Sequence, residues 1–300
     1  MLSTVVIAND SVVSVGVASW WASLCVVAAV NIAAWSWTGA ALRRRSVSMT
    51  VDSLAASRMQ LMLSGVYVLG CAFRSVLPVY DIPRLCLFDL WLSSVVVGRS
   101  VATVAELAFA GQWALLLHAA ATAAQSSFAR TVALLLVPLI AIAEICSWYA
   151  VLTTTNLAHV AENSTWALSA LLVTAAMLAI LPRCEAPRRR VLLAWCLAGL
   201  AYVAFMVLFD VPTYWARHLA DEALGRHYMT LAQGLADVAT RRVVSYRWED
   251  WKTEVVWMTL YFSVAVWFSI SLINVRVPLM SLTARKAKIS PAATTSGARI

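Results

Sequence analysis

Four fully charged side chains fall within the long apolar segments of this sequence, where charge is rare. They are Arg74, Arg99, Glu106 and Glu144. An ionised group at the centre of a bilayer costs at least about 2.5–3.5 kcal/mol on insertion scales, so such residues usually face the interior of a helix bundle and are paired. Intramembrane residues of this kind are therefore candidates for an ion-pair or ligand-binding site.

The positions of these residues indicate which of them meet. Arg99 lies nine residues into an apolar segment that begins at 90, and Glu144 lies nine residues before the end of one that stops at 153. Both side chains are then about 13 Å deep, measured from the same membrane surface. We therefore expect an Arg99–Glu144 ion pair. Arg74 lies nearer that surface, within reach of Asp89, and Glu106 is left in the opposite half.

More polar residues follow Glu144 along the chain, and they lie at the same end of neighbouring helices. Carboxylates among aromatic rings suit the binding of a cation. The alternative is a purely structural role, in which the aromatic residues form an interfacial belt and the buried pairs only hold helices together. The predicted ligand or ion-pair site consists of Arg74, Asp89, Arg99, Glu106, Glu144, Trp148, Asn156, His159 and Glu162.

Other chemistry has weaker support in the sequence. His159 with Glu162, and His218 with Glu222, could each supply two metal ligands from one helix face, but solvated polar loops explain both pairs, so we expect no metal and no cofactor. The six cysteines form no C-x-x-C pair, and no nucleophile elbow or phosphate-binding loop is present. Catalytic residues therefore stay unknown. Asn163 opens a glycosylation sequon and is a candidate for that modification.

The composition identifies the environment in which these residues must be positioned. The chain has 300 residues, of which 62% are hydrophobic and 13% charged, whereas soluble domains average about 25% charged residues. A membrane span needs about 20 apolar residues. The sequence thus predicts an all-α, polytopic integral membrane protein, a seven-transmembrane-helix bundle, with spans at 14–40, 60–79, 90–119, 131–153, 165–182, 191–210 and 254–277. Nucleic-acid binding, intrinsic disorder and a disulfide-stapled mini-domain are excluded.

The formal net charge of +8 indicates orientation, because cytoplasmic loops hold an excess of Lys and Arg. With the N-terminus outside or lumenal and the C-terminus cytoplasmic, most basic residues fall inside and most acidic ones outside. The inner arginine clusters are Arg43, Arg44 and Arg45, and Arg188, Arg189 and Arg190. The N-terminus has no Arg-rich transit signal, so the plasma membrane or the secretory endomembranes are favoured over mitochondria.

The segments outside the spans are few. Residues 1–282 are expected to form one membrane domain. Its loop at 211–252 has apolar residues at helical spacing, which predicts an amphipathic helix on the outer surface. We favour a connector that rests on lipid over a lid that covers a site. Residues 283–300 read as a flexible, basic cytoplasmic tail.

Three families of seven-span proteins do not fit the residues. Retinal proteins need a lysine in the last span, and the three lysines here lie outside it. Rhodopsin-like receptors carry Asp-Arg-Tyr and Asn-Pro-x-x-Tyr motifs that are missing here. Zinc-dependent hydrolases similar to adiponectin receptors and alkaline ceramidases need an H-x-x-x-H pair, which His118, His159, His218 and His227 do not form. No family follows from the residues.

Three functions therefore stay open. The first is an outward-facing polar and aromatic intramembrane site that binds a small polar, cationic or amphipathic ligand, in a receptor-like or transport-related protein. The alternatives are a non-catalytic membrane scaffold or subunit, and a membrane-embedded lipid-modifying enzyme with Glu144 or Glu106 as acid or base. The expected partners are the lipid bilayer, an unidentified small-molecule or lipid ligand and a membrane-protein partner, with no nucleic acid.

Overall fold

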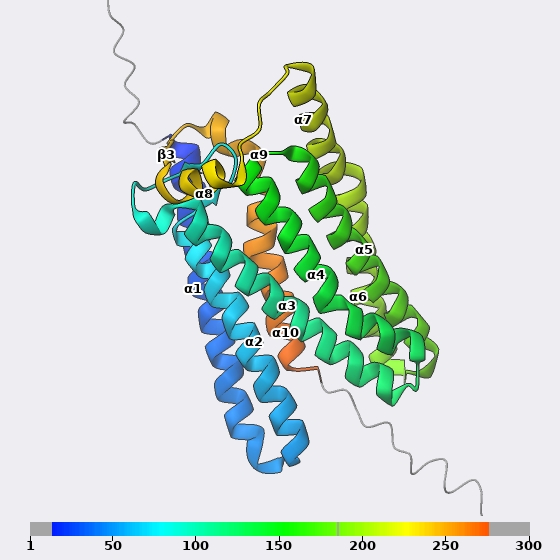
Figure 1. Cartoon of the computed structure of the whole chain (residues 1–300). Helices are drawn as coiled ribbons and strands as arrows, with labels where there is room; N and C mark the ends of the chain where they lie inside the picture. Colours follow the sequence, from blue (N-terminus) through cyan, green and yellow to red (C-terminus); the bar gives the residue numbers. More distant parts are fainter. Residues whose placement is uncertain (1–13, 185, 276–300) are drawn as a thin grey trace, which may run out of the picture.

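The computed structural model describes residues 14–184 and 186–275. Within these residues, seven helices are long and apolar enough to cross a bilayer, as the hydropathy pattern predicts (Figure 1). Short 3-10 turns lie beside them at η1 (Ser46–Ser48), η2 (Trp91–Ser93) and η3 (Leu181–Arg183). Five of the spans are single helices: α1 (Val15–Arg45), α2 (Val51–Val76), α3 (Val95–Ala123), α4 (Ser127–Thr153) and α5 (Asn156–Ile180).

The sixth and seventh spans each contain a π-helical turn. The sixth runs through α6 (Ala186–Phe205), η4 (Met206–Asp210) and α7 (Val211–Ala223), and the seventh through α9 (Trp248–Leu260), η5 (Tyr261–Ala265) and α10 (Val266–Ile273). In η5 the Phe262 carbonyl accepts a hydrogen bond from Asn31 Nδ2 over 2.8 Å, so a side chain of α1 satisfies a backbone group of the widened turn. Such turns inside α-helices are frequent at functional sites.

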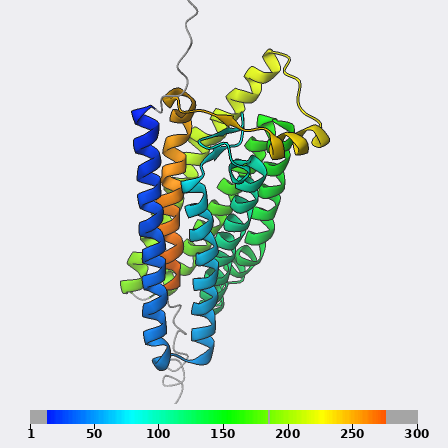
Figure 2. The same ribbon diagram turned by 90° about the vertical axis from the view of Figure 1, so that its left-hand side faces the viewer.

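The bundle has two distinct ends. One end carries a small sheet and the short helix α8 (Leu231–Thr240), and we call it the sheet end; the opposite end, which holds the α1–α2, α3–α4 and α5–α6 connections, is the hairpin end. The seventh span packs among α1, α2 and α3, and α6 packs on α5. Figure 2 shows the seventh span side by side with α1. The sixth and seventh spans, although consecutive in the chain, therefore pack against different helices.

The small sheet is the part of the fold that the predicted all-α class omits. Its strands are β1 (Val79–Tyr80), β2 (Leu85–Cys86) and β3 (Val243–Val244), with β1 antiparallel and β3 parallel to β2. The buried Arg84 fixes the β1–β2 turn, because it donates to the Asp81 and Val151 carbonyls, each over 2.7 Å, and pairs with Asp237 of α8 at 2.8 Å. The loop between α2 and α3 is thereby fastened to both α4 and α8.

The structure divides the predicted amphipathic segment at 211–252 into two helices. Its first part is α7, which continues the sixth span beyond the neighbouring helices (Figure 1). Its second part is α8, which packs across α4 so closely that a Cβ built on Gly234 would lie 1.8 Å from the Leu152 carbonyl oxygen. Amphipathic spacing fixes which face is apolar but not the direction of the helix axis, so the sequence could not separate these two helices.

Two of the helices begin nine residues earlier than hydropathy alone predicts. α2 starts at Val51 instead of 60, because the Thr50 side chain caps it by accepting from the Ser53 backbone N–H. α5 starts at Asn156 instead of 165, so the polar stretch before 165 is helical and one face of it enters the bundle. The predicted tail at 283–300 lies outside the described residues.

Candidate functional site

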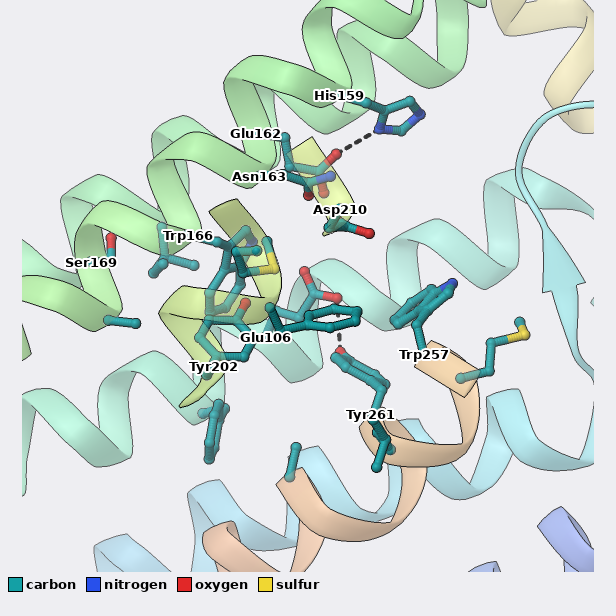
Figure 3. Close-up of a pocket in the computed structure, with 18 of the residues that line it drawn as sticks. Glu106, His159, Glu162, Asn163, Trp166, Ser169, Tyr202, Asp210, Trp257 and Tyr261 are labelled. Atoms are coloured by element: carbon teal, nitrogen blue, oxygen red, sulfur yellow. Dashed lines mark hydrogen bonds and ion pairs between the residues drawn. The ribbon is translucent and has the colours of Figure 1, made fainter. Parts of the chain in front are cut away.

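A cavity of about 890 Å³ lies inside the bundle, with walls from α2, α3, α4, α5, α6, η4, α7, α9 and η5. Its polar part is near the sheet end, and its apolar part extends toward the hairpin end between residues such as Leu136, Val173 and Met177. This volume is within the range of about 300–1,000 Å³ that is usual for small-molecule sites. Figure 3 shows the acidic and aromatic side chains that meet in it.

Arg99 is the centre of the polar part. Its Nη2 lies 2.9 Å from Glu144 Oε2, and this is the ion pair expected from the helix depths. The same nitrogen is 3.4 Å from both Glu106 Oε2 and Glu162 Oε1, and Nη1 is 3.9 Å from Asp81 Oδ2. Glu106 is therefore not left alone as predicted, because it lies on the same face of α3 as Arg99 and the guanidinium reaches it. One cation is shared by four carboxylates.

Glu144 accepts a hydrogen bond from one further side chain, which a second side chain supports in turn. Thr103 donates its hydroxyl to Glu144 Oε2 over 2.6 Å, and Trp148 donates its indole N–H to Thr103 Oγ1 over 3.0 Å. Neither Glu144 nor Trp148 lines the cavity. Their place in the site is to position Arg99, and a ligand in the cavity would not touch them.

Glu106 faces the seventh span across the cavity. Tyr261, in the π-helical turn η5, donates its hydroxyl to Glu106 Oε1 over 2.7 Å (Figure 3). The Tyr261 ring packs edge-on against Tyr67, which stacks on Phe109 with ring centroids 4.6 Å apart. These rings form an aromatic wall directly below the carboxylate.

The α5 wall carries a second acidic group. His159 Nδ1 lies 2.7 Å from Glu162 Oε2 (Figure 3), and the His159 ring packs on Tyr214 of α7 with centroids 4.8 Å apart. Asn156, one turn before His159, donates its side-chain amide to Asp221 Oδ2 over 2.7 Å. Because Tyr214 and Asp221 belong to α7, this helix closes the cavity against α5.

Asp210 differs from the other carboxylates of the cavity. It ends η4 and projects into the cavity near Glu162 and Asn163 (Figure 3). Within the described part of the chain, no basic side chain forms an ion pair with it and no donor bonds to it. The carboxylate oxygens of Asp210 are therefore open to a hydrogen-bond donor or a cation on a ligand.

Toward the sheet end, charge-balanced pairs line the cavity. Arg217 Nη2 is 3.8 Å from Glu254 Oε1, Arg217 Nη1 is 3.1 Å from the Tyr80 hydroxyl, and Trp257 donates its indole N–H to Glu254 Oε2 over 2.7 Å. Burial raises the pKa of the Tyr80 hydroxyl far above its usual range, so Tyr80 stays neutral. This layer adds no net charge to the cavity.

Arg74 does not pair with Asp89, the partner that the sequence suggests. The expected partner Asp89 is an exposed residue that pairs with Arg242 Nε at 2.7 Å. Arg74 is instead 3% exposed, lines the cavity and lies over the Phe262 ring at 5.8 Å. Its Nε and Nη1 are buried without a hydrogen-bond partner in the described residues. The β2–β3 contact explains the change, because it brings Arg242 to Asp89.

Most of the predicted site residues converge on one place. The predicted residues that line the cavity are Arg74, Arg99, Glu106, Asn156, His159 and Glu162. Asn163 is also buried and lines the cavity, a position that argues against glycosylation, since modified sequons lie at the surface. The prediction omitted Asp81, Asp210 and Tyr261; Tyr261 lies within an apolar run, where its hydroxyl gives no periodic signal.

Metal binding has no structural support in the described ranges, where no group of three His, Cys, Asp or Glu side chains could hold an ion. His218 and Glu222 are 4.0 Å apart on α7, with Glu222 largely exposed. Comparison of the chain with protein-family models, with curated proteins and with solved structures finds no match in any of the three. A function for this chain must therefore be argued from its own residues and their geometry.

Proposed function

We propose that this chain binds an amphipathic ligand with a cationic head group in the cavity, within a membrane that its seven spans cross. The observation that carries the proposal is the charge imbalance around Arg99. One guanidinium contacts four carboxylates, and Asp210 faces the same cavity with no basic partner in the described chain. Glu106, Glu144 and Glu162 are buried, and carboxylates that are kept from water need a compensating cation or proton.

The shape of the cavity supports a cation with an apolar tail. Trp166, Trp257 and Tyr261 surround the acidic groups (Figure 3), and aromatic faces attract organic cations at close range. Toward the hairpin end the walls are apolar. An amine or quaternary ammonium would lie among Glu106, Glu162 and Asp210, with its alkyl chain directed away from the sheet end.

Spans six and seven supply the lateral boundary of the cavity. Tyr202 of α6 and Val264 of η5 line the cavity and are both partly exposed on the flank of the bundle. Because α6 packs on α5, and η5 packs on α1 and α2, this boundary is formed by helices with different neighbours. In a bilayer the flank would face acyl chains, which is a route for an amphipathic ligand.

The proposed orientation places the sheet end outside the cell or in a lumen. Arg43, Arg44 and Arg45 lie in the last turn of α1, at the hairpin end, and cytoplasmic loops collect such clusters. The ligand would then bind in the outer half of the membrane.

The test is a titration of purified protein in neutral detergent with dodecylamine, dodecanoate and dodecanol, followed by tryptophan fluorescence. We expect saturable binding of the amine and at least about tenfold weaker binding after Asp210→Asn, which corresponds to about 1.4 kcal/mol. Asp89→Asn is the matched control, because that exposed carboxylate pairs with Arg242 away from the cavity. Equal binding of amine and alcohol would contradict the proposal and favour a scaffold.

A further inference from the structure

A cationic head group leaves one feature of the cavity unexplained, which is Arg74. This side chain lies near the end of α2, lines the same cavity and is 97% buried, since only 3% of it is exposed. Two of its donors, Nε and Nη1, bond to nothing in the described residues. A ligand that carried only a positive charge would leave these two donors without a partner.

Other buried arginines show what a satisfied guanidinium looks like in this fold. Arg84 is as deeply buried, and its Nε, Nη1 and Nη2 all donate to oxygen atoms. Arg99 contacts four carboxylates. Arg74 makes no ion pair in the described ranges, where its guanidinium lies over the Phe262 ring. Burying a charge without a partner is unfavourable, so the free donors mark a place for an anion.

We propose that Arg74 binds an acidic group of the ligand, so that the ligand of this cavity is a zwitterionic amphiphile with a phosphate or carboxylate beside its amine. This inference rests on the proposed function, which supplies the cationic half. The guanidinium fork matches both anions, because it can donate two parallel hydrogen bonds. Phe262, under Arg74, adjoins Tyr261, whose hydroxyl binds Glu106, so the anionic and cationic subsites are neighbours.

The experiment compares amphiphiles that share one alkyl chain and differ in the head group. The probes are dodecylamine, dodecanoate, dodecylphosphocholine and the dodecyl betaine that carries a carboxylate, each titrated into protein in neutral-detergent micelles and read by tryptophan fluorescence. We expect a zwitterion to bind at least about tenfold tighter than the amine, as a charge-assisted hydrogen bond allows. Preference for phosphocholine over betaine assigns the phosphate, and the reverse assigns the carboxylate.

The variants separate anion binding from packing. Arg74→Met, which keeps the apolar stem, should abolish the advantage of the zwitterion and leave dodecylamine binding intact or tighter. Arg74→Lys should keep part of the advantage, because it retains the charge but not the fork. Amine binding by a variant also shows that its cavity is folded. The inference is overturned if the wild type binds zwitterion and amine equally, or if Arg74→Met weakens both by the same factor.

Failure of the proposed function gives a different pattern. If dodecylamine does not bind but dodecanoate or a zwitterion binds in an Arg74-dependent way, the cationic site is wrong and the anion site stands. If dodecylamine binds and depends on Asp210, while no probe depends on Arg74, the cationic site stands and the anion site is wrong.

Discussion

Tyr261 donates a hydrogen bond from its hydroxyl to Glu106 Oε1 over 2.7 Å, and this contact joins the seventh span to the third across the cavity. A buried carboxylate that loses such a donor is left with an unmet acceptor. The same contact places an aromatic face next to the acidic group, so one residue serves both the stability of the bundle and the chemistry of the cavity.

Tyr261→Phe should lower the free energy of unfolding by about 1–3 kcal/mol, because it removes one hydrogen bond to a buried acid and leaves the ring in place. Thermal unfolding in neutral detergent measures the change. Tyr149→Phe is the matched control, since the Tyr149 side chain is 51% exposed. An equal, small effect of both changes would contradict the structural importance of this contact.

Arg99→Met should destabilise the protein strongly, by about 3–5 kcal/mol, because it strands several buried carboxylates. A double-mutant cycle with Glu144→Gln should show coupling. The Asp89 and Arg242 pair provides the comparison, since its carboxylate is 71% exposed and surface pairs contribute about 0–1 kcal/mol. Absence of coupling between Arg99 and Glu144 would show that the pair is not formed in the folded protein.

Gly234→Ala should loosen α8 from α4, because a methyl group at this position would overlap the Leu152 carbonyl oxygen at 1.8 Å. We expect faster hydrogen exchange across Leu231–Thr240 with little change in the membrane spans. Gly111→Ala is the control, where the nearest atom would be at an ordinary contact of 3.6 Å. Unchanged exchange in α8 would contradict this packing.

The orientation can be tested with single cysteines at the two ends of the bundle. Leu224→Cys at the sheet end and Val47→Cys at the hairpin end replace residues that are 83% and 94% exposed. In intact cells we expect an impermeant maleimide to label the first and not the second, because arginine clusters such as the one at the hairpin end favour a cytoplasmic location. Labelling of position 47 alone would reverse the topology.

The sequence predicted the seven long apolar helices and the Arg99–Glu144 pair, because both follow from apolar length and from the depth of each residue along its helix. It did not predict which further side chains contact this pair. Glu162 reaches Arg99 because α5 begins at Asn156 and turns one polar face inward. The two-residue strands are too short for an alternating pattern.

Arg99, Glu106 and Glu144 all belong to the consecutive helices α3 and α4, and this has a consequence for biosynthesis. During membrane insertion, a helix that carries an unpaired charge resists leaving the translocation channel for lipid. Since Arg99 already contacts Glu106 within α3 and Glu144 in the next helix, one guanidinium can partly compensate both carboxylates before α5 is synthesised. We expect α3 and α4 to enter the bilayer together as one helical hairpin.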